Sequence, residues 1–126
     1  MPLILVVDDD MNLRAAIRRM LEAAGFEVQE ADGEQALLAF RLCQPDLVLS
    51  DMFMPGTDGI ELIRLLSREA PGLRIVAMSG GGHKGSLNLL SIAERLGAAE
   101  VLLKPFQHSQ ILETIIRVLA APPRCT

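Results

Sequence analysis

The sequence predicts an α/β fold, a doubly wound five-stranded parallel sheet with five helices. Short aliphatic runs alternate along the whole chain with segments of helical periodicity, and polar residues follow the runs where strands would end. The 126 residues, 50% hydrophobic and 22% charged, suit a single well-packed domain. We expect one domain over residues 1–121 and an irregular tail over residues 122–126, where two prolines stand together.

Five short segments are rich in aliphatic residues and are predicted to be strands. Most read as continuous apolar runs, which is typical of parallel strands buried on both faces. The segment "FEVQE" instead alternates apolar and polar residues, which favours an edge strand with one wet face. The expected strands are residues 3–7, 26–30, 47–49, 75–78 and 100–106.

Between the strands, apolar residues recur three and four positions apart and mark one face of each helix. Asp32 with Gln35, and Asp58 with Glu61, have the spacing of capping boxes at helix starts. Strict alternation of strands and helices favours βαβ units with right-handed crossovers and helices on both faces of the sheet. The expected helices are residues 13–24, 32–42, 58–69, 86–97 and 111–119.

Charge and composition argue against several function classes. The net charge is -4 and the arginines are scattered, so we expect no nucleic-acid binding by this chain. No apolar run approaches the roughly 20 residues that span a bilayer, and the start "MPLILVVDDD" lacks the basic region of a signal peptide. Cys43 and Cys125 have no CxxC spacing, which favours a reduced cytoplasmic protein without a disulfide.

Polar side chains gather at the carboxyl ends of four predicted strands, where ligands bind in open α/β sheets. Asp8 and Asp9 follow the first strand, Asp51 follows the third, Ser79 the fourth, and Lys104 lies near the end of the fifth. If the first and third strands are neighbours, three carboxylates converge and repel one another. Mg²⁺ would remove that repulsion, because it takes one or two carboxylates and recruits phosphate oxygens.

The run "DDD" also has a simpler interpretation as the start of a helix. Acidic side chains are stabilising there because of the helix macrodipole. We assign this role to Asp10, which is nearest the helix, and the ligand role to Asp8 and Asp9.

Four motifs together resemble the receiver domain of two-component response regulators. They are "LVVDDD", "LVLSDMFMPGTDG", "VAMSG" and "LLKPF", in that order, and the resemblance extends from Leu3 to Leu119. It implies the flavodoxin-like receiver fold, with strand order 2-1-3-4-5.

The resemblance also implies site roles. Asp51 is expected to be the phosphoacceptor, attacking the phosphoryl group of a phosphohistidine to form an acyl phosphate. Asp9 matches the direct ligand of Mg²⁺ (or Mn²⁺), Asp8 the position that often acts through water, and Phe53 the ligand that uses its backbone carbonyl. Asp51 completes the metal set.

Two further residues have roles in the family. Lys104 is expected to pair with a phosphoryl oxygen, and Ser79 to move its hydroxyl to another as the switch. The bond from Lys104 to Pro105 matches one that is usually cis in the family. The chain is then a signalling phosphoacceptor with at most slow self-dephosphorylation, and not an enzyme.

The implied partners are a histidine kinase or histidine phosphotransfer protein, and a target bound by the surface of the fourth helix, fifth strand and fifth helix. A monomer or a weak phosphorylation-dependent dimer is expected. Val101 departs from the family, which usually has Tyr or Phe there. His83 and His108 are expected to be solvated, and Cys43 to serve packing.

Two other functions are weighed against the phosphoacceptor. A haloacid-dehalogenase-type phosphatase also uses a strand-end Asp with Mg²⁺, but Asn12 breaks its first motif and no acidic pair follows the fourth strand. A receiver-like module that signals by contact, without phosphorylation, is compatible with Val101. Such a module would not need the complete set of site residues, which are Asp8, Asp9, Asp51, Ser79 and Lys104.

Overall fold

The computed structural model describes residues 2–54, 57–80, 95, 98–104 and 107–120. Three expectations lie outside the described residues: most of the helix over 86–97, the bond from Lys104 to Pro105, and the tail over 122–126.

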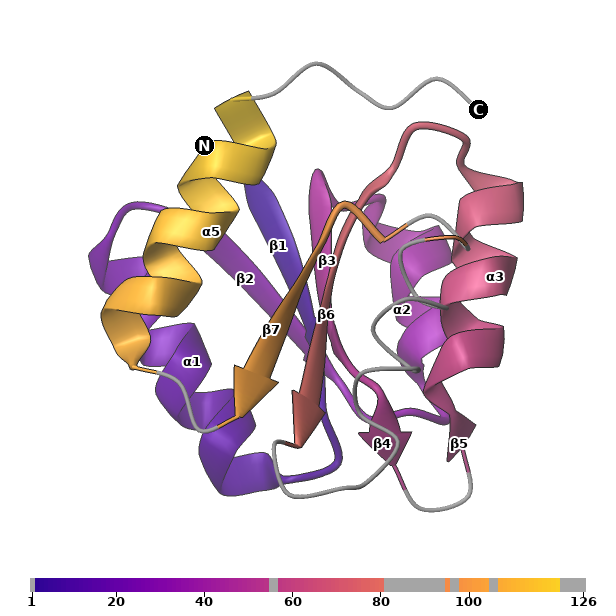
Figure 1. The fold of residues 1–126 in the computed structure, drawn as a ribbon, viewed down its shortest axis with the longest axis horizontal. Helices are drawn as coiled ribbons and strands as arrows, with labels where there is room; N and C mark the ends of the chain where they lie inside the picture. Colours follow the sequence, from indigo (N-terminus) through magenta and orange to yellow (C-terminus); the bar gives the residue numbers. More distant parts are fainter. Residues whose placement is uncertain (1, 55–56, 81–94, 96–97, 105–106, 121–126) are drawn as a thin grey trace.

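Five parallel strands form one sheet, and their arrowheads point to the same edge (Figure 1). The order β2-β1-β3-β6-β7 places the second strand of this sheet outermost, next to the first, with the third, fourth and fifth following. This confirms the predicted order 2-1-3-4-5. The strands are β1 (Leu3–Val7), β2 (Glu27–Ala31), β3 (Leu47–Asp51), β6 (Arg74–Gly80) and β7 (Glu100–Lys104).

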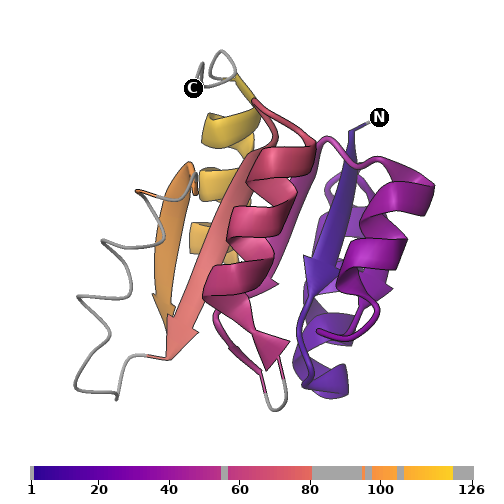
Figure 2. The ribbon, with the colours of Figure 1, turned by 90° about the vertical axis from the view of Figure 1, so that its right-hand side faces the viewer.

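The four described helices cover both faces of the sheet. Figures 1 and 2 show α1 and α5 against one face and α2 and α3 against the other. This arrangement confirms the doubly wound architecture. The helices are α1 (Met11–Ala23), α2 (Ala36–Cys43), α3 (Gly59–Glu69) and α5 (His108–Ala120).

Alternate side chains of the central strands feed two separate cores. On β1, Leu5 and Val7 pack with α2 and α3, whereas Ile4 and Val6 pack with α1 and α5. Each fully buried aliphatic side chain contributes roughly 1.5–3 kcal/mol relative to an exposed one. Because both faces are covered, each side chain of β1 and β3 is packed in one of the two cores, and this close packing holds the register in which those strands end.

The edge strand follows its predicted alternation over its first residues. Val28 is buried in the core with α1 and α5, while Glu27 and Gln29 face the other side and are exposed. The alternation ends at Ala31, which lies on the side of Glu27 and Gln29 but is buried in the core with α2 and α3. One face of β2 therefore meets water at Glu27 and Gln29, as the "FEVQE" pattern indicated.

The start of α2 differs from the prediction. The helix begins at Ala36, four residues after the expected position, and its N-cap Gln35 makes no side-chain capping bond. Asp32 Oδ1 instead accepts a hydrogen bond from the Gln35 amide at 2.9 Å, across a turn. The Asp32 bond of the predicted capping box is therefore present, but it spans a turn over residues 33–35 and the helix begins only after it. The Gly33 amide also donates to Asp9 Oδ1 at 3.0 Å, which ties this turn to the end of β1.

A short antiparallel pair follows β3. Strands β4 (Phe53–Met54) and β5 (Thr57–Asp58) pair Phe53 with Asp58 and Met54 with Thr57. The sequence indicated only a turn at "MPG". The pair lies beside the edge at which the parallel strands end (Figure 1).

Asp10 is the N-cap of α1, as predicted. Its backbone is extended, and its Oδ1 accepts hydrogen bonds from the amides of Asn12 and Leu13 at 3.0 and 3.2 Å.

Replacing Asp10 should therefore cost helix stability. We expect Asp10→Ala to lower the free energy of unfolding by about 1 kcal/mol, because two amides lose their acceptor. Asp10→Asn retains an oxygen acceptor and should stay within a few tenths of a kcal/mol of the wild type. Urea denaturation measures both, and equal stability of the two variants would contradict the capping role.

Candidate functional site

Two buried acids lie at the ends of neighbouring strands. In the register of β1 with β3, Val7 lies opposite Ser50, so Asp8 and Asp51 each come next along their strands. Asp8 is 1% exposed and Asp51 is 6% exposed. Burial of a carboxylate is costly unless hydrogen bonds or a cation compensate it. Two such groups at one sheet edge therefore point to a cation or ligand site there.

The backbone and side chains of Asp8 and Asp9 are held by main-chain groups. The Asp8 amide donates to the Ala31 carbonyl at 3.2 Å, which extends the pairing of β1 with β2 by one residue. Asp8 Oδ1 accepts from the Asp10 amide at 2.9 Å, and Asp9 Oδ1 accepts from the Gly33 amide at 3.0 Å. Each of these carboxylates is thus oriented by a main-chain amide.

The segment after Asp51 is fixed in the same way. The Met52 amide donates to the Met78 carbonyl at 2.8 Å, so the end of β3 remains bound to β6. Gly59, the first residue of α3, packs directly on the Met52 backbone, because a Cβ there would lie 2.5 Å from the Met52 carbonyl oxygen. The backbone leading to Phe53 is therefore confined between β6 and α3.

Ser79 and Lys104 reach the same edge by their backbone positions. In the pairing of β6 with β7, Ser79 lies opposite Leu103 and Gly80 opposite Lys104. The structure describes only the backbone of these residues and of Phe53. It brings the backbone positions of all six expected site residues to one end of the molecule, and it buries the side chains of Asp8 and Asp51.

The oxygen donors at this edge fit a hard divalent cation. Carboxylates and a backbone carbonyl are the ligands that Mg²⁺ prefers, with water completing its shell. Within the described ranges, no group of three or more His, Cys, Asp or Glu side chains is arranged to enclose a metal. Mg²⁺ does not need such a cage, because one or two carboxylates and retained waters suffice.

An arginine that the sequence analysis did not identify contacts this site. Arg14 Nη1 donates to the Asp8 carbonyl oxygen at 2.6 Å, and Arg14 Nε donates to Glu30 Oε1 at 2.9 Å. Burial raises the pKa of Glu30, but hydrogen bonds from Arg18 and Arg14 outweigh it, and the net pKa lies below the ordinary value. One feature of the sequence could have indicated this contact. Glu30 is an acidic residue on the predicted edge strand, and the preceding helix carries Arg14 and Arg18.

Val101 and Cys43 have the surroundings of packing residues. Val101 is half-buried and packs against the core cluster shared with α2 and α3. Cys43 is a half-buried free thiol, and burial raises its pKa, as expected for an unreactive cysteine. His108 is exposed at the start of α5, as expected, and His83 lies outside the described residues.

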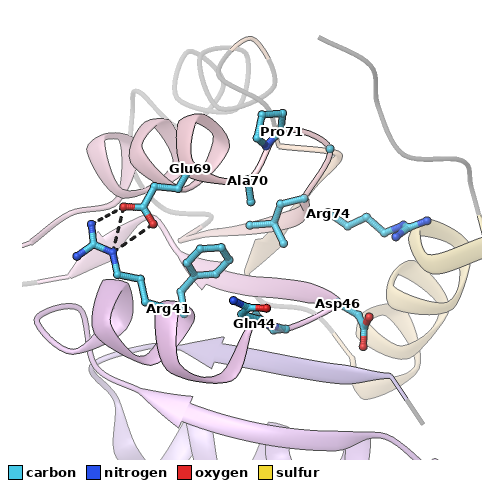
Figure 3. A pocket seen from close by; sticks show the side chains of 11 residues that line it. Arg41, Gln44, Asp46, Glu69, Ala70, Pro71 and Arg74 are labelled. Carbon is cyan, nitrogen blue, oxygen red and sulfur yellow. Dashed lines mark hydrogen bonds and ion pairs between the residues drawn. The ribbon is translucent and has the colours of Figure 1, made fainter.

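A pocket of about 490 Å³ lies at the opposite end of the sheet, between the segments that precede β3 and β6. Figure 3 shows the Arg41–Glu69 ion pair along one side of it, with Asp46 and Arg74 farther along. Because β3 and β6 are parallel, this pocket is separated from Asp51 by the length of the strands. It contains none of the expected site residues.

The contact between Gly59 and Met52 predicts a local effect of substitution. Gly59→Ala should displace the Met52 backbone and destabilise the protein by about 1–3 kcal/mol, as overpacking does. Gly25→Ala is the control for a glycine substitution that creates no steric contact. The added Cβ there has no atom within 4 Å, and the substitution strains only the backbone, whose φ is +98°. We expect the Met52 amide resonance to shift in Gly59→Ala only; an unchanged resonance in that variant would contradict the packing argument.

None of the helices in the described part of the chain has the length and apolar character needed to cross a membrane.

Comparison with known proteins places this geometry in a family. The family model "Response regulator receiver domain" matches residues 4–116. Protein CcdB of Bacillus subtilis is 33% identical over 118 residues, which cover 92% of this chain and 96% of that protein. Sporulation initiation phosphotransferase F of the same species is 32% identical and is covered to 92%.

Longer regulators and solved structures also match. The transcriptional regulatory protein DctD of Pseudomonas aeruginosa is 36% identical over 118 residues, but this chain covers only 25% of it. The crystal structure of the receiver domain of NtrX from Brucella abortus has a TM-score of 0.84 and 32% identity, over 92% of this chain and 97% of that one. With the fold, the acid-lined sheet edge and the matched residues in agreement, the chain belongs to the response regulator receiver domain family.

Proposed function

We propose that this chain accepts a phosphoryl group from a histidine kinase or histidine phosphotransfer protein onto Asp51, with Mg²⁺ or Mn²⁺ bound, and thereby changes its affinity for a partner. The observation that carries the proposal is the burial of Asp8 and Asp51 at the ends of adjacent parallel strands. The similarity to a sporulation initiation phosphotransferase supports phosphoryl exchange as the chemistry.

The transfer is a nucleophilic displacement at phosphorus. A carboxylate oxygen of Asp51 forms the new P–O bond while the P–N bond of the phosphohistidine breaks, and the electron pair goes to the imidazole nitrogen. The product on this chain is an acyl phosphate. Such transfers depend on positioning and electrostatic stabilisation, which a buried, backbone-fixed Asp51 supplies.

The remaining site residues would bind either the cation or the phosphoryl oxygens. Asp9, Asp51 and the Phe53 carbonyl would hold the cation, with Asp8 acting through water. A cation held by these residues would neutralise charge on the transferring phosphoryl group. Lys104 pairs with one phosphoryl oxygen and Ser79 donates to another. One phosphate is taken per site, so the chain signals and does not turn over a substrate.

The output is a population shift toward a state that the phosphate stabilises. The proposed contact surface is formed by the helix expected from the sequence over residues 86–97, which lie mostly outside the described residues, together with β7 and α5. Ile116 on α5 is 52% exposed and offers an apolar contact there. Dimerisation, if it follows phosphorylation, would use the same surface.

Val101 supports a second candidate, a module that signals by contact alone. A half-buried valine packed against the core cannot provide the aromatic rotamer change that usually transmits the switch in this family. In this second candidate, Asp8, Asp9 and Asp51 are present in the chain but Asp51 is never phosphorylated.

Intact mass spectrometry tests the proposal. After incubation with Mg²⁺ and acetyl phosphate, we expect the wild type to gain the mass of one phosphoryl group and Asp51→Asn to gain none. EDTA should abolish the gain, because the acidic site needs a cation to accept an anionic group.

Other outcomes reassign the site or the function. A gain that survives Asp51→Asn would place the nucleophile elsewhere, and repeated hydrolysis of the donor would favour a phosphatase. If no gain occurs, titration with Mg²⁺ and beryllofluoride, which mimics the acyl phosphate, decides between the candidates. Absence of any spectral change would favour the contact-only module.

A further inference from the structure

We propose that Arg14 is a positioning residue for the metal site, and that Glu30 holds Arg14 in the place where it does this. Arg14 fixes the Asp8 backbone through the carbonyl oxygen, while its charge is paired with Glu30. This inference rests on the proposed function, because it concerns the cation that the phosphoacceptor site would bind.

The geometry of Arg14 joins three elements. From the first turn of α1, its guanidinium reaches the Asp8 carbonyl at the end of β1, at 2.6 Å, and Glu30 on β2, at 2.9 Å. The Arg14 side chain is only 16% exposed, so these bonds are largely shielded from water. Hydrogen bonds to charged groups in such surroundings are stronger than those between neutral groups.

Glu30 is positioned to direct this arginine. It pairs with Val6 in the register of β1 and β2, and its side chain is 22% exposed. Arg18 donates to its second oxygen at 3.0 Å and also lies 3.4 Å from Glu22. The carboxylate of Glu30 is thus bound by two arginines at once.

The choice of partner matters for a cation site. An arginine near several carboxylates would ordinarily form ion pairs with them and so compete with Mg²⁺. Here Glu30 satisfies the charge of Arg14, and the fork of the guanidinium uses another N–H on a carbonyl oxygen of Asp8. Residues that orient the ligands of a metal in this way are needed for full affinity.

Asp8 is therefore fixed from three directions. Its amide bonds Ala31, its carbonyl accepts from Arg14, and its Oδ1 accepts from the Asp10 amide. Of these bonds, only the one from Arg14 comes from a side chain that a substitution can remove.

Arg18 provides a matched control. It carries the same charge, lies on the same helix and binds the same carboxylate, but it is Arg14 that bonds the Asp8 carbonyl oxygen. If long-range electrostatics alone governed the site, removing either positive charge would tighten Mg²⁺ binding. If position governs it, loss of Arg14 weakens binding, and the sign of the change separates the two explanations.

The test is isothermal titration calorimetry of Mg²⁺ with the wild type, Arg14→Ala, Arg14→Lys and Arg18→Ala. We expect Arg14→Ala to raise Kd about 10-fold or more, as loss of an outer-shell partner does. Arg14→Lys should also weaken binding, because a lysine keeps the charge but lacks the planar fork. Arg18→Ala should bind as tightly as the wild type or slightly tighter.

A readout without metal guards against a merely unstable variant. The Asp10 amide, which donates to Asp8 Oδ1, should shift its ¹⁵N–¹H resonance in metal-free Arg14→Ala and Arg14→Lys, but not in Arg18→Ala. Circular dichroism shows whether each variant is folded, and the folded Arg14 variant with the smaller stability loss is used for the comparison.

The outcomes are distinguishable. If the wild type binds Mg²⁺, and the Arg14 variants bind it as tightly and show an unchanged Asp10 resonance, the role of Arg14 is overturned. The proposed function is then left intact. Wild type that binds no Mg²⁺ would overturn the proposed metal site itself, and with it this inference.

Discussion

The pairing of β1 with β3 is the constraint on which the rest of this structure depends. It places Asp8 and Asp51 side by side at one sheet edge and buries both. Alone, such an arrangement is unfavourable, because burial and mutual repulsion both disfavour the charged carboxylates. The two aliphatic cores maintain it, since a shift of one residue in either strand would exchange side chains between two closely packed cores. The stability of the cores thus holds an electrostatically demanding site in place.

Around these two acids, nearly every neighbouring element contributes a fixed contact. The amide of Gly33 orients Asp9, the bond from Met52 to Met78 holds the chain after Asp51, and Gly59 presses on the same segment. A site of this kind is prepared before any ligand arrives, which is what a transfer that depends on position and charge requires. The pocket at the opposite end has none of these features.

The fold was largely predictable from the sequence, because aliphatic runs and helical periodicity are local signals of the burial that builds the sheet. The ends of β1 and β3 followed from those runs, so Asp8 and Asp51 could be placed together before the structure was known. The start of α2 differs although Asp32 makes the predicted bond to the Gln35 amide, because residues 33–35 form a turn, which a contact with Asp9 ties to the end of β1, and the helix begins at Ala36. Arg14 was missed because its partners are distant in sequence: Asp8 follows β1 and Glu30 lies on β2. Nothing in the sequence of α1 itself distinguishes Arg14 from the neighbouring arginines.

The central claim, that Asp51 carries the phosphoryl group, is tested most directly by reducing the phosphorylated protein with borohydride. This reagent converts an acyl phosphate on an aspartate to homoserine, and peptide mass spectrometry locates the change. The account predicts homoserine at position 51 alone, dependent on Mg²⁺ during phosphorylation. Homoserine at position 8 or 9, or a phosphate that resists borohydride and remains on a serine or histidine, would contradict it.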